Sequence, residues 1–242
     1  MKKQWNLIAA ALAVCCLGCG VTGCAPTEEE PTKLYAPYYE EDLNEMTFTD
    51  MQTSLVLDMS ANTYLKTLLL QTEYYEYTPT AEETASVNYT LSLQDMDLQI
   101  FNGGVVRFLS MNGESVEETT AKVIGNGFSY FETMFLGGEV AFEGYNAEQT
   151  IQVTNALQAT ATVSDSEGFL DAMQDLRFIK VKDKAHYQTG EALYTVTIGQ
   201  ESLVFYENFA SKSGELYILS QGDYGFLKAL QFEYSSGFLP SL

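Results

Sequence analysis

Few side chains in this sequence are able to carry out acid–base, nucleophilic or metal chemistry. His186 is the only histidine, so a metal site built from several histidines is excluded, and a serine–histidine–acid arrangement would have to use this residue. No G-x-S-x-G nucleophile elbow accompanies it. Because His186 lies in the polar segment KDKAHYQTG, we expect an exposed loop residue rather than a general base.

Other short motifs of catalytic or cofactor-binding proteins are incomplete. GNG at 125–127 lacks the third glycine and the preceding strand of a dinucleotide-binding fingerprint, and we interpret it as a turn. DMD at 95–97 begins like a calcium loop but lacks the later ligands, which favours a turn between two strands. The pairs Glu82–Glu83 and Glu117–Glu118 are expected in a chain with 33 acidic residues. The sequence therefore predicts a protein that is not an enzyme and needs no cofactor and no metal.

The overall charge restricts the partners. The chain is 46% hydrophobic and 13% aromatic, which is typical of a globular protein, and its formal net charge is −21. Such a surface repels nucleic-acid phosphates, so we expect no nucleic-acid partner.

The four cysteines all lie within the first 24 residues, at Cys15, Cys16, Cys19 and Cys24. Two lysines near the amino terminus precede the run LIAAALAVCCLGCGV, whose fifteen apolar or small residues are fewer than the ~20 of a membrane-spanning helix. This arrangement is typical of a signal peptide.

The residues VTG at 21–23, directly before Cys24, resemble the lipobox of bacterial lipoproteins. The resemblance implies cleavage before Cys24, a diacylglyceryl group on its sulfur, and a lipid-anchored position on the extracytoplasmic face of the cell membrane. Cys19 matches less well, because Cys16 stands where leucine or valine is expected. An ordinary secretory signal and an uncleaved anchor are the alternatives.

The segment 24–45 reads as an acidic tether, because it holds three of the five prolines and seven acidic residues. The tyrosines at 35, 38 and 39 offer an alternative in which part of this segment docks on the folded body. Beyond the tether, YLKTLLLQ (64–71) aligns with FLDAMQDL (169–176) and NYTLSL (88–93) with LYTVTI (193–198), a separation of 105 residues. RFLS (107–110) then aligns with YILS (217–220) after an insertion of five residues in the second copy. The order of elements, more than the identities, indicates a duplication.

Each copy is predicted to contain one helix and about four antiparallel strands. The helices are expected behind Ser60 and behind the capping-box pair Ser164 and Glu167. Asn-Gly at 102–103 predicts a hairpin, SVEETTAKVI (115–124) resembles a helix, and FSYFETMF (128–135) fits either type. We therefore predict an α+β fold with two tandem modules, which loosely resembles the architecture of secreted β-lactamase inhibitory proteins. The expected organisation is a signal peptide at 1–23, the tether at 24–45, and modules at 46–148 and 149–242.

Two clusters are candidate binding surfaces. Tyr74, Tyr75 and Tyr77 cannot all face one way on a strand, so at least one is expected to point outward, where tyrosines favour protein contacts. Lys180, Lys182 and Lys184 would form a basic stripe on a strand whose Ile179 and Val181 face the core. Packing under a loop and protection of a sheet edge are the structural alternatives.

These observations favour a non-catalytic, lipid-anchored envelope protein whose tandem modules bind another protein or peptide. The alternative is a receptor for a small ligand or glycan, with its site between the modules.

The lipobox hypothesis is tested on Cys24. Mass spectrometry of the protein recovered from its own host should find Cys24 as the first residue, carrying a diacylglyceryl group. Cys24→Ala should remove the lipid mass and keep the leader attached. Cys19→Ala should leave the mass of the mature protein unchanged, because Cys19 belongs to the leader that is cleaved off. A bare Cys24 sulfur with the leader still joined would contradict the assignment.

Overall fold

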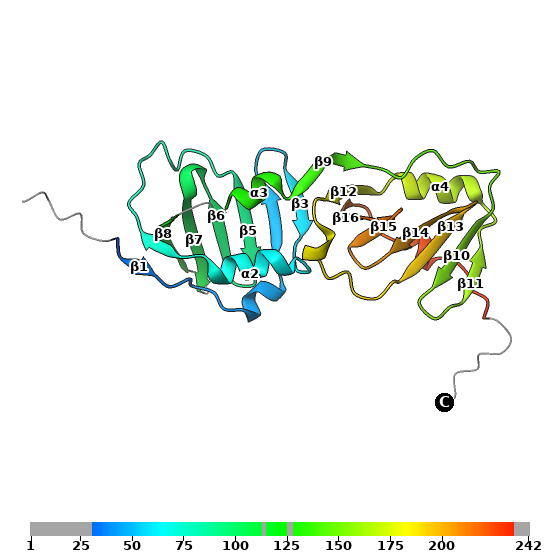
Figure 1. The fold of residues 1–242 in the computed structure, drawn as a ribbon, viewed down its shortest axis with the longest axis horizontal. Helices are drawn as coiled ribbons and strands as arrows, with labels where there is room; N and C mark the ends of the chain where they lie inside the picture. Colours follow the sequence, from blue (N-terminus) through cyan, green and yellow to red (C-terminus); the bar gives the residue numbers. More distant parts are fainter. Residues whose placement is uncertain (1–30, 113–114, 125–127, 235–242) are drawn as a thin grey trace, which may run out of the picture. The chain divides into compact units, whose positions relative to one another are not determined.

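The folded part of the chain is mostly β. The computed structural model describes residues 31–112, 115–124 and 128–234, and from Lys33 onward they belong to one compact unit. This part contains two antiparallel sheets of eight strands each and only four short α-helices (Figure 1). The predicted α+β fold, with one helix on about four strands in each module, is therefore wrong.

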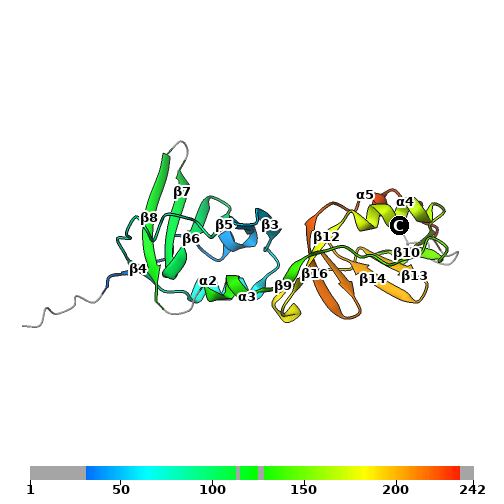
Figure 2. The same ribbon diagram turned by 90° about the horizontal axis from the view of Figure 1, so that it is seen from above.

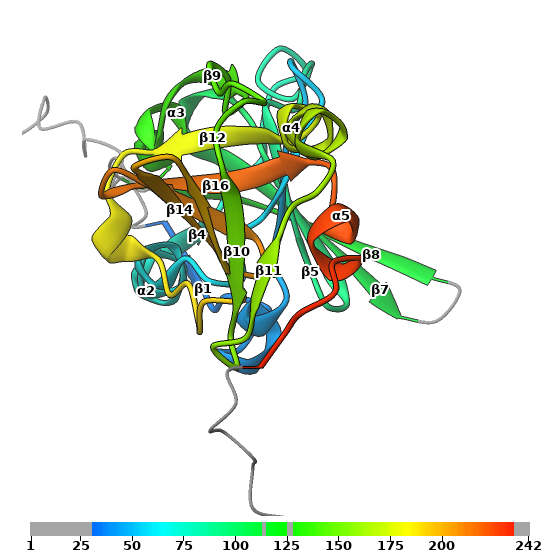
Figure 3. The same ribbon diagram turned by 90° about the vertical axis from the view of Figure 1, so that its right-hand side faces the viewer.

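The first sheet is built from residues 33–123 and carries its helices on one side. From edge to edge its strands are β1 (Lys33–Leu34), β4 (Tyr74–Glu76), β8 (Ser115–Val123), β7 (Val105–Asn112), β6 (Met96–Ile100), β5 (Tyr89–Leu93), β2 (Thr47–Asp50) and β3 (Leu55–Asp58). The helices are α2 (Thr63–Gln71) and α3 (Ser129–Thr133), with 3-10 turns at Glu41–Asn44 and Asn102–Gly104. Figures 2 and 3 show β7 and β8 projecting together beyond the rest of the sheet.

The second sheet begins before residue 149, in the segment that the sequence analysis assigned to the first module. Its strands are β11 (Thr160–Thr162), β10 (Ile151–Asn155), β13 (Tyr194–Ile198), β14 (Glu201–Phe205), β15 (Phe209–Lys212), β16 (Glu215–Gln221), β12 (Arg177–Val181) and β9 (Phe135–Val140). The helices α4 (Ser166–Gln174) and α5 (Gly225–Lys228) accompany it, with a 3-10 turn at Lys184–His186.

The two sheets repeat one strand order. If the strands of each sheet are numbered from one to eight along the chain, both sheets have the spatial order 1-4-8-7-6-5-2-3, with the second sheet read from β9 to β11. Strand β9 therefore corresponds to β1, and β16 to β8. The strands β5 and β13, and likewise β6 and β14, lie 105 residues apart. This repetition is what a duplication predicts. It pairs β7 with β15, so the alignment of RFLS with YILS, which joined β7 to β16, was wrong.

Several local expectations are corrected by the structure. Residues 115–123 of SVEETTAKVI form strand β8 rather than a helix, because residues 115–122 pair with β7 and this pairing overrides local propensity. Asn62 caps α2 in place of Ser60, and Asp165 caps α4 in place of Ser164. Asn102–Gly104 does join two antiparallel neighbours, with positive φ at both glycines.

The hydrophobic core forms two clusters that meet at β12. Phe178 faces the second cluster, where its ring stacks 4.7 Å from that of Phe142. Ile179 and Val181, which point the other way, are buried in the first cluster, as is Ile218 of β16. The first core therefore includes side chains from the second sheet.

Polar contacts join the two halves beside this core. Asn62 and Tyr187 form an isolated antiparallel bridge, and Gln188 N donates to Ala61 O at 2.8 Å. The Thr63 hydroxyl donates to the His186 carbonyl at 2.8 Å. Asn62 is completely buried: its Oδ1 accepts from Leu65 N at 2.9 Å and its Nδ2 donates to the Tyr130 hydroxyl at 3.0 Å.

None of the helices in the described ranges combines the length and apolar composition needed to cross a membrane. The predicted signal peptide, Cys24 and the GNG turn at 125–127 lie outside those ranges.

Part of the predicted tether belongs to the core, as the docking alternative required. Tyr38 is 4% exposed, and its hydroxyl donates to Leu69 O at 3.0 Å and lies 2.7 Å from the Tyr74 hydroxyl. Tyr35 and Tyr39 are exposed. Burial raises the pKa of Tyr38 to about 12, although the hydrogen bond with Tyr74 opposes this change.

The raised pKa of Tyr38 predicts a loss of stability in alkali. In the unfolded chain tyrosine titrates near pH ~10, so between about pH 10 and 12 the unfolded state holds fewer protons and the free energy of unfolding falls. Between pH 9 and 11 the free energy of unfolding of Tyr38→Phe should therefore fall by about 1.4 kcal/mol less than that of the wild type, as measured by urea unfolding. Tyr35→Phe should follow the wild type, and equal losses in all three proteins would contradict the prediction.

Removal of the Asn62 side chain should destabilise the junction. Asn62→Ala leaves Leu65 N without its cap and the Tyr130 hydroxyl without its donor, so the free energy of unfolding should fall by about 1–3 kcal/mol. The control Asn44→Ala, at an exposed site, should change it by less than about 0.5 kcal/mol. A loss at Asn62 as small as at Asn44 would show that this contact does not stabilise the junction.

Candidate functional site

A large cavity is lined by residues of both sheets. It has a volume of about 790 Å³, and we call it the junction pocket. One wall comes from β2, β3 and β5 of the first sheet, and another from β9, β12 and β16 of the second, with α3 between them. The residues that line it include Phe48, Asp50, Val56, Tyr89, Phe131, Glu132, Phe135, Gly137, Gly138, Glu139, Ile179 and Ser220.

Aromatic rings form the floor of the junction pocket. The rings of Phe48 and Phe131 stack with centroids 5.5 Å apart and an interplanar angle of 5°, and Tyr89 stacks on Phe48 at 5.5 Å. Phe48 and Phe131 are buried, whereas Tyr89 is only half-buried. The floor is thus an edge of the first core, and its packing holds the Tyr89 ring in place.

Three carboxylates line the junction pocket together with these rings. Asp50 ends β2, where its Oδ1 accepts from Gln52 N at 2.8 Å and fixes the turn into β3. Glu132 is exposed on α3. Glu139 on β9 accepts from the Ser220 hydroxyl at 2.6 Å. No Lys, Arg or His occurs among the described residues that line the pocket.

Asp50 and Glu132 act on the same phenol. Burial raises the pKa of Tyr89, and the negative charges of Asp50 and Glu132 raise it further. Two carboxylates from separate elements therefore produce a negative potential at one hydroxyl group. The Tyr89 hydroxyl remains neutral and available as a hydrogen-bond donor at physiological pH.

The wall formed by β9 is irregular. Phe178 pairs with Val140 and Lys180 with Leu136, so Gly137, Gly138 and Glu139 together oppose Ile179 alone. This bulge takes backbone groups out of the regular ladder. Gly137 has φ +78°, and a Cβ on either glycine would meet no heavy atom within 4 Å, so the wall is open toward the pocket.

His186 lies in a second, smaller cavity of about 400 Å³. Its ring stacks on Tyr64 with centroids 4.1 Å apart, and its Nε2 lies 3.5 Å from Asp183 Oδ2. The neighbouring Tyr187 hydroxyl is buried close to Tyr130 and Asn62, and burial is the main reason that its pKa is raised. His186 is partly covered by these rings rather than fully exposed.

The predicted tyrosine cluster divides between core and surface. Tyr74 is buried against Tyr38, whereas the Tyr75 hydroxyl donates to the exposed Glu73 at 2.9 Å. The Tyr77 hydroxyl donates to Glu83 at 2.8 Å, so this ring packs under a loop.

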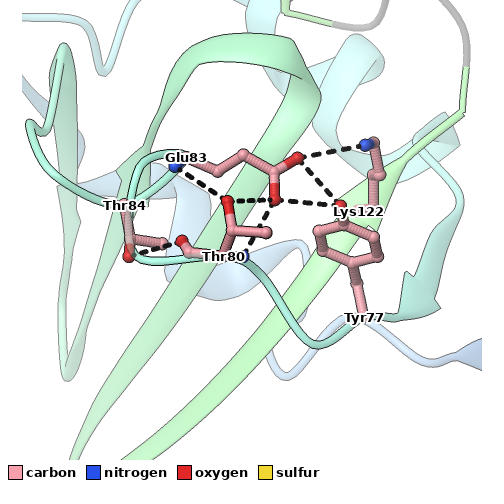
Figure 4. A network of polar contacts seen from close by, with 5 residues as sticks. All are labelled: Tyr77, Thr80, Glu83, Thr84 and Lys122. Carbon is pink, nitrogen blue, oxygen red and sulfur yellow. Dashed lines mark hydrogen bonds and ion pairs between the residues drawn. The ribbon is translucent and has the colours of Figure 1, made fainter.

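The loop over Tyr77 is held by a polar network (Figure 4). Glu83 accepts from Thr80 N at 3.0 Å and pairs with Lys122 at 3.6 Å. The backbone hydrogen bond from Thr80 is the main reason that the pKa of Glu83 is lowered, with the Tyr77 hydroxyl adding to it. The Lys122 ammonium lies 4.4 Å from the centre of the Tyr77 ring.

The three predicted lysines occupy three different settings. Lys180 pairs with Glu215 at 3.2 Å. Lys182, beyond the end of β12, lines the His186 cavity. Lys184 donates to Gly214 O at 2.8 Å. Tyr74 is thus a core residue, whereas Lys180 and Lys184 contact the neighbouring residues Glu215 and Gly214.

Sequence reasoning missed the junction pocket. Its residues come from TFTD (47–50), from FSYFETMF, whose type was left open, and from FLGGEV (135–140). One usable signal was present: TFTD, a polar turn and LVLD together read as a hairpin, with an aspartate beginning the turn.

Comparison with family models, with curated proteins and with solved structures found no match to this chain. Within the described residues, no group of three or more His, Cys, Asp or Glu side chains is arranged to hold a metal ion.

Proposed function

We propose that this chain is a non-catalytic, lipid-anchored binding protein of the extracytoplasmic face, and that its junction pocket takes up an extended segment of another protein or peptide. The lipid anchor rests on the lipobox at Cys24. The absence of catalytic motifs from the sequence and the chain's strong negative charge support a binding role without nucleic acid.

One observation carries the peptide-binding role: the pocket lies between two sheet edges. β3 is the last strand of the first sheet and β9 the last strand of the second, and residues of both line the pocket. An edge strand offers backbone groups to which an extended peptide can add as a further strand. The aromatic floor then provides a place for one of the peptide's side chains.

A receptor for a small ligand is the second candidate. The volume of about 790 Å³ falls within the ~300–1,000 Å³ that small-molecule sites occupy. The two candidates differ in the mass of what binds, and one experiment separates them.

The test places a photo-crosslinking amino acid at Val56 in the full-length protein on its native cells. Val56 lines the pocket and is 50% exposed. The expected adduct is a polypeptide, and Gly138→Trp, which adds a large side chain to the pocket wall, should remove it. Crosslinking at Leu157, which is 66% exposed and does not line the pocket, is the control and should be indifferent to Gly138→Trp.

An adduct of small mass would favour the small-ligand receptor. Adducts at Val56 that persist with Gly138→Trp, or the absence of any adduct, would contradict a binding role for the junction pocket.

A further inference from the structure

We propose that the segment bound in the junction pocket carries a lysine or arginine, whose cationic group lies against the Tyr89 ring between Asp50 and Glu132. This inference rests on the proposed function and adds the chemical class of the ligand.

Asp50 and Glu132 lack a counter-charge among the residues that the structure describes. Six ion pairs occur among the described residues, and neither Asp50 nor Glu132 takes part in one. The pocket lining adds Glu139, which accepts from Ser220, and contains no basic residue within the described ranges. An incoming cation would therefore meet negative charge that the described part of the chain leaves unneutralised.

Two other tyrosines of this chain each hold a lysine against their ring. Lys122 lies 4.4 Å from the centre of the Tyr77 ring and 3.6 Å from Glu83, and the Tyr77 hydroxyl donates to the same carboxylate (Figure 4). A tyrosine ring and a carboxylate thus hold one ammonium group between them.

The same arrangement occurs in the second half of the chain. Lys212 lies 4.8 Å from the centre of the Tyr145 ring and 3.4 Å from Glu201, which accepts from the Tyr145 hydroxyl at 3.0 Å. Cations are attracted both to the face of an aromatic ring and to a carboxylate, and the two attractions add when they converge.

Tyr89 has the ring and the carboxylates of such a site but no lysine. Asp50 is the cross-strand partner of Tyr89 in the β2–β5 pairing, Glu132 lines the same pocket, and the ring is held by Phe48 and Phe131. The missing member of the group is a basic side chain, which a segment bound in the junction pocket would supply. The chain's net charge of −21 would also attract a basic segment over a longer range.

The inference is tested with two matched peptides on the full-length protein in detergent micelles. The probes are fluorescent five-residue peptides, Thr-Val-Lys-Val-Thr with blocked ends and the same peptide with acetyl-lysine in the middle. They have equal length and β-propensity and differ by one charge. Fluorescence anisotropy should give at least ~10-fold tighter binding for the lysine peptide.

Asp50→Asn with Glu132→Gln should abolish this preference. Asparagine keeps the Oδ1 acceptor for the turn, and if the double variant does not fold, Glu132→Gln alone should reduce the preference several-fold. The matched control is Glu82→Gln with Glu148→Gln, which removes the same charge from exposed sites outside the pocket and should keep the preference.

Three results would overturn the inference. The first is equal affinity of the wild-type protein for the two peptides, or no binding of either. The second is an equal loss of preference in the control variant, and the third is binding of n-butylamine as tight as that of the lysine peptide. The first two would exclude a specific cation site, and the third would assign it to a free amine. None of them alters crosslinking at Val56 that depends on Gly138, so the failure of this inference and the failure of the proposed function are distinguishable.

Discussion

The two-sided burial of β12 and β16 is the constraint on which the rest of the structure depends. Successive side chains of a strand point to opposite faces, so one strand can serve two cores. Phe178 packs into the second core, while Ile179, Val181 and Ile218 complete the first. Burying each of these aliphatic side chains stabilises the fold by about 1.5–3 kcal/mol, and this contribution would be lost if the halves separated. The repeated halves are therefore parts of one folded body.

The junction pocket follows from the same packing. Ile179 belongs to the first core and also lines the pocket, as do Phe48 and Phe131. A floor made from core side chains is rigid before any ligand arrives, so little conformational entropy is lost when one binds. The carboxylates, in contrast, come from a strand end, a short helix and a bulged edge, where the sequence is free of packing constraints. Rigidity and charge are thus supplied by different elements.

Sequence reasoning was most accurate where a pattern was local. The alignment of NYTLSL with LYTVTI, which are strands β5 and β13, and the Asn-Gly turn were predicted because alternation and turn chemistry are properties of a few neighbouring residues. It failed where pairing between distant segments decides the outcome. SVEETTAKVI has helical composition but lies against β7, and the number of strands in each sheet depended on short edge strands such as β1 and β9. The pocket was missed for the same reason, since its walls come from segments on both sides of residue 130.

The first strand has a consequence for where the protein can work. Lys33 and Leu34 pair with Tyr75 and Tyr74, so the folded body begins only nine residues after Cys24. A fully extended chain covers at most about 3.3–3.6 Å per residue, so the linker between Cys24 and Lys33 spans at most about 30 Å. If Cys24 bears the lipid, the folded body is confined to a layer close to the bilayer, and the proposed ligand segment would have to reach that layer.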